Sequence, residues 1–195
     1  EFRLEAGRTE IETETSAGRT LAATAADSGR DLSQEYWSVG HSGTWGNART
    51  DLSFQQERGT RESYSYDAGL DSMVRNDRVP RVKNSVLEGK LTLPLSLRGE
   101  HTLVTGFQHQ SAEVTDRGHT AVDQKLAVDQ WALFAEDEWK ITDSFALTGG
   151  LRYDHHESYG GHISPRLYAV WHGTEQLTLK GGVSTGFRAP DVRQV

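Results

Sequence analysis

The stretch that decides the fold is Leu177–Arg188, which reads LTLKGGVSTGFR. Its odd-numbered positions are apolar, small or β-branched, from Leu177 and Leu179 through Val183 to Phe187, and its even-numbered positions are polar or small. Successive side chains of a strand point to opposite faces, so a period of two gives a sheet one apolar side and one polar side. The stretch therefore predicts a strand over residues 176–188, not a helix.

The same stretch holds Gly182, Ser184 and Gly186 at the G-x-S-x-G spacing of the serine-hydrolase nucleophile elbow. In such an elbow the serine sits on a sharp turn between a strand and a helix, and the acid and the histidine follow it along the chain. Here Ser184 lies within the strand alternation, and the nine residues after Gly186 include Asp191 but no histidine. We therefore expect no catalytic residue and no enzyme.

The period of two recurs upstream and predicts about nine strands, near residues 2–14, 36–45, 48–58, 82–95, 100–114, 129–141, 145–156, 163–173 and 176–188. Short connections are expected at Gly46-Asn47, Pro94–Gly99, Thr142–Ser144 and Gly173–Glu175, and long ones at 15–35, 59–81, 115–128 and 157–162. The two kinds alternate, as in an antiparallel transmembrane β-barrel with short turns on one side and long loops on the other. A soluble β-sandwich, whose connections mix in length and cross between sheets, is the alternative.

Aromatic side chains mark both ends of the expected apolar band. Trp45, Trp139, Phe145 and Trp171 lie at the short turns, and Phe107, Trp131, Tyr153 and Phe187 lie near the long loops. Two such belts are typical of a barrel at its two membrane interfaces, and core aromatics of a soluble β-protein are the alternative. Asp137 shares the parity of Trp131 and Leu133, so it is a charge on the face expected to meet lipid. Its closeness to a short turn lowers the cost.

Composition excludes other classes of protein. The 195 residues carry a formal charge of −7, which does not suit nucleic acid as a partner, and they include no cysteine, which excludes disulfides and thiolate metal sites. The mean hydropathy is −0.64, and no run approaches the roughly 18 apolar residues of a membrane helix. An unclosed sheet with an odd number of strands leaves edges that lipid cannot satisfy, so we expect an internal part of a larger barrel.

The long connection 59–81 carries the strongest candidate for a ligand site. Arginine and tyrosine gather there in an otherwise acidic chain, at Arg61, Tyr64, Tyr66, Arg75, Arg78 and Arg81. Together they suit an anionic aromatic ligand through charge, hydrogen bonding and stacking. The alternative is a solvated loop, since the connection also holds Glu62, Asp67, Asp71 and Asp77.

Two other polar groups carry weaker signals. His155, His156, Glu157 and His162 are side chains that zinc accepts, but they lack the H-E-x-x-H spacing on a helix, so we expect a solvated loop and no metal site. Glu136 and Glu138 share one face of a strand, and we expect them to line a polar lumen.

Four segments resemble the barrel of TonB-dependent outer-membrane receptors, and most closely the catecholate-siderophore branch that includes the colicin I receptor and the ferric-enterobactin receptor. They are FAEDEW (134–139), LTGGLRYDHH (147–156), SPRLYAVW (164–171) and LKGGVSTGFRAP (179–190). Their order and spacing are specific, and they cover roughly the last third of the chain. Residues 1–128 match by architecture more than by motif.

The resemblance implies a multi-pass protein of the bacterial outer membrane, with a barrel of about 22 strands around a plug domain. Residues 1–195 would form part of that barrel domain, with the plug domain and the C-terminal strands outside them. The whole receptor would take up ferric siderophores, iron being cargo and not a cofactor. Its partners would be the outer-membrane lipid, colicins, and the TonB–ExbB–ExbD system through an N-terminal part.

Within the family the element Gly186-Phe187-Arg188-Ala189-Pro190 is similar to a structural motif, and Pro190 would end the strand because proline cannot donate to a ladder. The sequence does not decide which ligand the receptor binds. Haem, cobalamin or another metal chelate are alternatives to a ferric catecholate, and a soluble β-sandwich binding module is the alternative outside the family.

Overall fold

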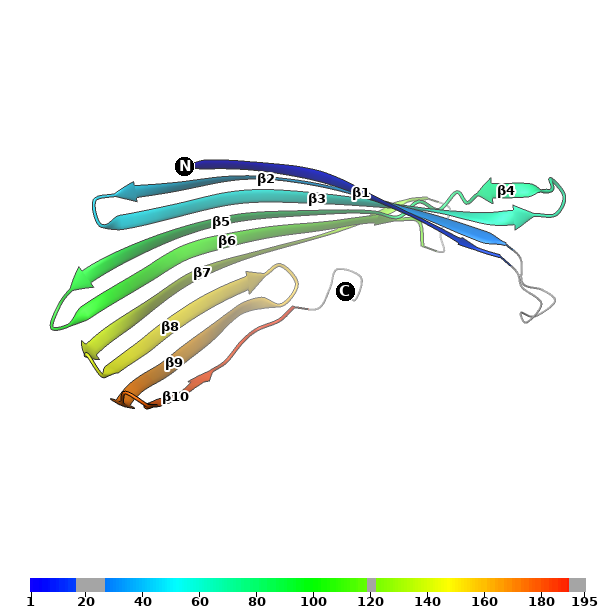
Figure 1. The fold of residues 1–195 in the computed structure, drawn as a ribbon. Coiled ribbons are helices and arrows are strands. Elements are labelled where there is room, and N and C mark those ends of the chain that lie inside the picture. Colours follow the sequence, from blue (N-terminus) through cyan, green and yellow to red (C-terminus); the bar gives the residue numbers. More distant parts are fainter. Residues whose placement is uncertain (17–26, 119–121, 190–195) are drawn as a thin grey trace.

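The computed structural model describes residues 1–16, 27–118 and 122–189 and shows a single antiparallel sheet (Figure 1). Its strands are β1 (Phe2–Thr15), β2 (Ser28–Trp45), β3 (Ala48–Asp67), β4 (Ser72–Arg75), β5 (Arg81–Ser96), β6 (Glu100–Asp116), β7 (Gln124–Thr142), β8 (Phe145–His156), β9 (Gly160–Thr174) and β10 (Leu177–Ser184). All strands but β4 follow one another across the sheet in chain order, and β4 pairs only with β3. This is the meander that the alternating connections predict. Among the described residues no helix is long and apolar enough to span a membrane.

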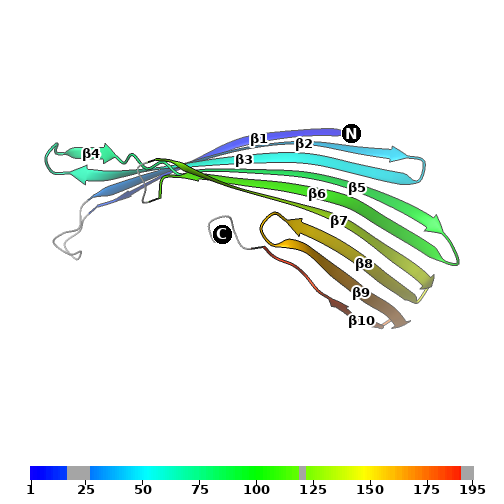
Figure 2. The same cartoon turned by 180° about the vertical axis from the view of Figure 1, so that it is seen from behind.

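Over the residues that the structure describes, the sheet is one curved layer with no second layer packed against it (Figures 1 and 2). Its solvent-accessible surface is 13941 Å², whereas a folded globular monomer of this mass exposes about 9,200 Å². In the described part of the chain, the only buried hydrophobic residues are Val114 and Ala132. The described residues therefore form no hydrophobic core of their own, and the alternative of a soluble β-sandwich is wrong.

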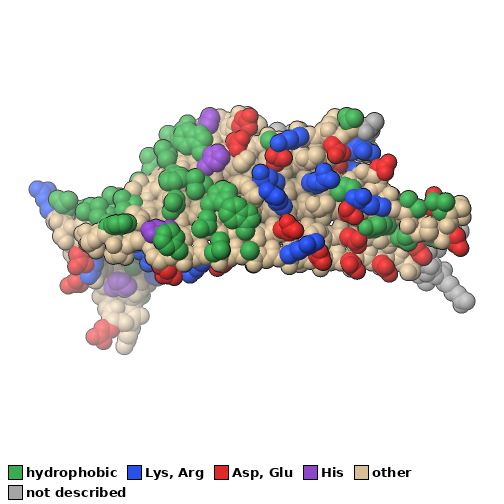
Figure 3. All heavy atoms as spheres, turned by 90° about the horizontal axis from the view of Figure 1, so that it is seen from above, with side chains coloured by type: hydrophobic (Ala, Val, Ile, Leu, Met, Phe, Trp, Pro, Cys, Tyr) green, Lys and Arg blue, Asp and Glu red, His purple; other side chains and the backbone are tan. Residues whose placement is uncertain are grey.

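One face of the sheet carries an exposed apolar band. The register aligns Val39 with Phe54 and Phe54 with Leu87, and further along the same face Leu133 and Leu151 are 53% and 54% exposed. We call the side of the sheet on which these five side chains lie the apolar face, along the whole length of the strands. The opposite side is the polar face. In Figure 3 hydrophobic side chains gather on the part of the visible face toward the short turns, and charged ones gather beyond them.

The strands continue past the apolar band further than the sequence predicts. β2 begins at Ser28, inside the predicted loop 15–35, and β3 continues to Asp67, inside the predicted loop 59–81. β4 lies wholly within that second loop, so the sheet has ten strands and not nine. The predicted loops 115–128 and 157–162 are likewise shortened, by β6, β7 and β9. The extensions lack a consistent apolar side, so they show no alternation, although their backbone pairing continues.

The short turns lie where the sequence predicts them. β2 and β3 join at Gly46-Asn47, where Gly46 has a φ of 62°, and β5 and β6 join through Gly99, whose φ is 137°. Glycine adopts these backbone conformations at no steric cost. The remaining short turns join β7 to β8 and β9 to β10.

Candidate functional site

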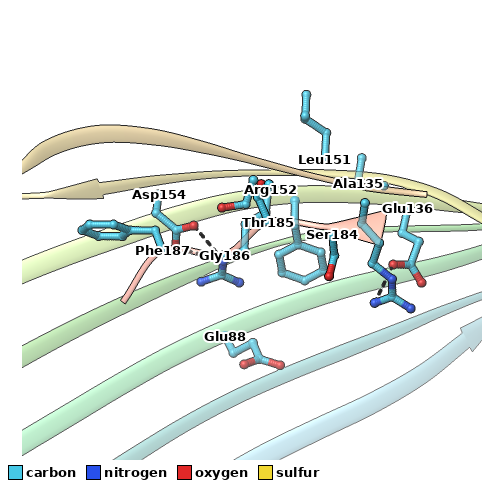
Figure 4. A pocket seen from close by; sticks show the side chains of 14 residues that line it. Glu88, Ala135, Glu136, Leu151, Arg152, Asp154, Ser184, Thr185, Gly186 and Phe187 are labelled. Carbon is cyan, nitrogen blue, oxygen red and sulfur yellow. Dashed lines mark hydrogen bonds and ion pairs between the residues drawn. The ribbon is translucent and has the colours of Figure 1, made fainter. Parts of the chain in front are cut away.

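A chain of polar contacts crosses the polar face and lines a hollow of about 450 Å³ (Figure 4). Its centre is Arg152 of β8, whose Nε donates to both carboxylate oxygens of Asp154 at 2.9 and 3.1 Å. The Nη2 of Arg152 donates to Gln108 Oε1 at 2.9 Å, and Gln108 Nε2 donates to Glu88 at 3.3 Å. The guanidinium carbon of Arg152 also lies 6.0 Å from the ring centroid of Phe134. One arginine thus links strands β5, β6, β7 and β8 from inside the curve of the sheet.

A second ion pair closes the hollow on the side of β9. Arg166 Nη1 lies 3.1 Å from Glu136 Oε2, in agreement with the expectation that Glu136 belongs to the polar face. Three carboxylates, Glu88, Glu136 and Asp154, line the hollow against the two guanidinium groups of Arg152 and Arg166. The hollow therefore carries an excess of negative charge, and both of its cations are already paired.

The segment after β10 lines this hollow through Thr185, Gly186 and Phe187 and is not part of a strand. The predicted strand 176–188 is therefore too long at its end. β10 ends at Ser184, and the N–H of Thr185 donates to the carbonyl of Pro165 at 3.1 Å. Because Pro165 has no N–H to return a bond, the ladder does not continue. Phe187 consequently lies not with the apolar belt but against His162, with ring centroids 3.9 Å apart. Ser184 ends a strand, and no helix follows it in the described residues up to 189.

The six residues predicted as a ligand site lie at the end of the sheet far from the short turns. Arg61, Tyr64 and Tyr66 belong to β3, Arg75 belongs to β4, Arg78 lies between β4 and β5, and Arg81 begins β5. The connection is therefore a strand extension with a hairpin and not an open loop. Strand parity separates the set: Arg61 lies on the polar face, whereas Tyr64, Tyr66, Arg75 and Arg81 lie on the extension of the apolar face.

Most of these side chains already have acidic partners. Arg75 Nη2 lies 2.5 Å from Glu62 Oε1, and the hydroxyl of Tyr64 donates to the other oxygen of Glu62 at 3.0 Å. The carboxylates of Asp31 and Glu62 raise the pKa of Tyr64 to about 12. In the same way, the hydrogen bond to Asp71 raises the pKa of Tyr66.

Arg78 is paired as well, since its Nε and Nη2 donate to the two oxygens of Asp116 at 2.8 and 2.7 Å. Arg61 differs from Arg75 and Arg78. Its Nε is buried without a hydrogen-bond partner, and within the described chain no carboxylate forms an ion pair with it. Arg61 is therefore a cation on the polar face whose guanidinium group is not paired with a carboxylate of the described residues.

The four candidate metal ligands do not come together. His155 lies on the apolar face beside Trp131, with ring centroids 5.5 Å apart. His156 is buried on the polar face, where its Nδ1 accepts a hydrogen bond from the N–H of Ser158 at 3.1 Å. Glu157 Oε2 accepts a hydrogen bond from the N–H of Asp129 at 3.2 Å, and His162 packs against Phe187. Over the described residues no group of three or more His, Cys, Asp or Glu side chains is placed to hold a metal ion.

A sequence model described as TonB dependent receptor-like, beta-barrel matches residues 6–195. The chain belongs to this family. The iron-regulated outer membrane virulence protein of Vibrio cholerae is 32% identical over 100% of this chain and 28% of its own length. The ferric enterobactin receptor PirA of Pseudomonas aeruginosa is 27% identical over 97% of this chain and 28% of its own length. The chain thus spans 28% of these curated relatives.

Solved structures of the family agree with the fold. The siderophore receptor PirA from Pseudomonas aeruginosa superposes with a TM-score of 0.71 at 26% identity, covering 84% of this chain and 28% of that one. The ferric enterobactin receptor of the same organism, in a double-mutant form, gives a TM-score of 0.75 at 20% identity, covering 98% and 35%. The predicted class, an antiparallel meander of a transmembrane barrel, is confirmed.

As part of a receptor barrel in the bacterial outer membrane, the chain has its apolar face toward lipid and its polar face toward the lumen. The short turns mark the periplasmic end and the strand extensions mark the extracellular end. The hollow around Arg152 is therefore lumenal, and the residues predicted as a ligand site lie at the outside end of the receptor barrel.

The sequence predicts that Asp137 is a charge on the lipid-facing side, and in the structure its partner is His101. Asp137 Oδ2 lies 2.7 Å from His101 Nδ1, and the other ring nitrogen of His101 lies 3.0 Å from the carbonyl of Leu97. The imidazole also stacks on Trp139, with ring centroids 5.3 Å apart. His101 therefore stabilises the Asp137 carboxylate within the periplasmic aromatic belt. The closeness of Asp137 to the membrane interface is not the only factor that lowers the cost of its charge.

The lumenal contacts of Arg152 and Arg166 were not predicted from the sequence. The sequence places each of these two residues at a polar position of a predicted strand, and it gives no further indication of their contacts. The pairing of Arg152 with Gln108 crosses two strand boundaries and depends on a register that no local motif states. Of the family motif, Gly186 to Ala189 form no regular structure, and Pro190 lies outside the described residues.

Proposed function

We propose that this chain is the central barrel wall of a TonB-dependent receptor for the active uptake of ferric siderophores of the catecholate type. The observation that carries the proposal is the match over 97% of the chain to a protein named as a ferric enterobactin receptor. Besides the relatives above, the ferrienterobactin receptor of Escherichia coli is 25% identical over 84% of this chain. Energy coupling through TonB–ExbB–ExbD, and recognition by colicins, belong to the same proposal for the whole receptor.

Of the six residues predicted as a ligand site, Arg61 is the strongest contact to propose. A ferric catecholate is anionic and aromatic, so a guanidinium on the lumenal side of the extracellular end offers it charge, hydrogen bonds and a stacking surface. Arg75 and Arg78 would first have to give up Glu62 and Asp116. Arg61 has no carboxylate partner to release among the residues that the structure describes.

The test is the affinity of the full-length receptor for ferric enterobactin, measured by quenching of its intrinsic fluorescence. The change Arg61→Ala should weaken binding about tenfold or more, because a hydrogen bond to a charged group contributes about 1.5–3 kcal/mol. Arg8→Ala is the matched control, since Arg8 lies on the other face of the sheet beside Glu10 and Glu35.

Two results would redirect the proposal. If Arg61→Ala binds normally while the combined change of Arg75 and Arg78 to alanine does not, the site lies at the end of β4 and its connection to β5, and not in the lumen. If the wild-type receptor prefers haem or cobalamin to ferric enterobactin, the substrate class is wrong whichever residue is changed.

A further inference from the structure

Three cations form a patch on the apolar-face side of the sheet, just beyond the extracellular edge of the apolar band. They are Arg58 of β3 and Lys83 and Arg81 of β5. With Thr60, Thr115 and Glu113 they line a hollow of about 180 Å³. Their parity is that of Phe54 and Leu87, so in the receptor they face outward, away from the lumen and its ligand.

The height of the patch follows from strand geometry. On β5 the apolar parity holds leucine or glycine from Leu95 to Leu87, then Ser85, and then Lys83. The ten steps from Leu95 to Ser85 cover about 33 Å along the strand at about 3.3 Å per residue. At the usual tilt of about 40° this is a rise of about 25 Å, which is the height of the lipid-facing band of an outer-membrane barrel. Lys83 therefore lies at the level of the outer-leaflet headgroups.

In the described part of the chain, the three cations of the patch outnumber the one carboxylate that lines it, Glu113. Arg58 and Lys83 are direct cross-strand partners, and like charges in that position destabilise a sheet. Glu113, the partner of Lys83 on the other side, is 2.9 Å from Lys125, and Glu35, the partner of Arg58, forms an ion pair with Arg8. Within the described residues neither Arg58 nor Lys83 nor Arg81 forms an ion pair. An anion from outside the chain would relieve this repulsion.

We propose that Arg58, Lys83 and Arg81 bind the phosphate of a lipid headgroup in the outer leaflet. Three observations point to a lipid phosphate: the patch continues directly from the membrane-facing band, it faces away from the lumen, and its hollow is lined by three cations and two threonine hydroxyls that suit phosphate oxygens. The one carboxylate in the lining, Glu113, is paired with Lys125. Arg81, predicted from sequence as a siderophore contact, is reassigned to this lipid site. The inference does not depend on which siderophore the receptor takes.

The test uses the full-length receptor in phosphatidylethanolamine nanodiscs that contain either lipid A or dephosphorylated lipid A, with lipid bound per receptor counted by native mass spectrometry. The double change Arg58→Ala with Lys83→Ala should weaken retention of lipid A about tenfold or more, given about 1 kcal/mol for each cation near a charged membrane surface. The control Arg30→Ala with Lys180→Ala removes the same charge from the polar face and should leave retention within about twofold.

Each further outcome decides for or against the site. The exchange Arg58→Lys with Lys83→Arg should retain lipid A, because it keeps both charges. Equal retention by the double alanine variant, equal retention of dephosphorylated lipid A, or full displacement by inorganic phosphate would overturn a lipid phosphate site. Heat-modifiable migration on gels confirms that each variant forms a barrel, and Arg58→Gln with Lys83→Gln replaces the alanine pair if that pair does not fold.

Discussion

At the scale of single residues, Gly106 of β6 has no room for a side chain between its neighbours on β5 and β7. A Cβ on Gly106 would lie 2.6 Å from Phe134 Cζ and would also meet the carbonyl oxygen of Gly89. Backbone cannot move aside as a flexible side chain can. We expect Gly106→Ala to lower the free energy of unfolding of the full-length receptor by about 1–3 kcal/mol, the usual range for overpacking. Urea unfolding in detergent measures it. Gly149→Ala, where nothing lies within 4 Å of the new Cβ, is the control, and equal losses in the two variants would count against the argument.

The pair of His101 and Asp137 is a second prediction at this scale. Removing His101 leaves Asp137 facing lipid without its hydrogen-bond donor, so His101→Ala should cost about 2 kcal/mol, as for a lost hydrogen bond to a charged group. Changing both residues to leucine should cost less than the single change, because no unpaired charge then remains. A double-mutant cycle of His101→Leu, Asp137→Leu and the double change, measured as unfolding free energies, gives the coupling. A coupling near zero would mean that Asp137 is solvated without its partner.

At the scale of elements, the hairpin of β3 and β4 is held by acidic groups around Tyr64. Because Asp31 and Glu62 raise its pKa to about 12, the folded hairpin favours the neutral phenol. This contribution to stability is present below the ordinary pKa of 10.0 and is lost as the pH rises through about 12. A difference ultraviolet titration of wild type minus Tyr64→Phe should show a midpoint near 12. Glu62→Gln should lower that midpoint, and a wild-type midpoint near 10.0 would contradict the assignment.

The same hairpin shows which parts of the strands cannot be predicted from the sequence pattern. Strands that cross the membrane are visible because lipid demands apolar side chains at every second position, which is why β8 is predicted to the residue. Beyond the apolar band water covers both faces, so β3 continues to Asp67 without any alternation to reveal it. The lack of alternation is also why the sequence did not predict the arrangement of the candidate ligand residues. Residue types suggested arginines and tyrosines at 59–81, but which face each one takes depends on strand parity in a segment that read as a loop.

At the scale of the whole molecule, the curved single layer has two unpaired sides. β1 pairs only with β2, and β10 pairs only with β9, within the part of the chain that the structure describes. The backbone groups along these edges have no ladder partner in the described sheet, and each unsatisfied group costs several kcal/mol in hydrocarbon. Only closure by further strands satisfies such edges in a membrane.

This gives a prediction for residues 1–195 expressed alone. In detergent we expect them to associate through the edges of β1 and β10 into a broad distribution of oligomers, because edge pairing is the nearest substitute for closure. The full-length receptor, prepared in the same detergent, should behave as a single species. Size-exclusion chromatography with light scattering distinguishes the two. A sharp monomer peak from residues 1–195 alone would mean that the sheet closes on itself at a smaller diameter. The lumenal contacts of Arg152 would then have to change, since they depend on the present curvature.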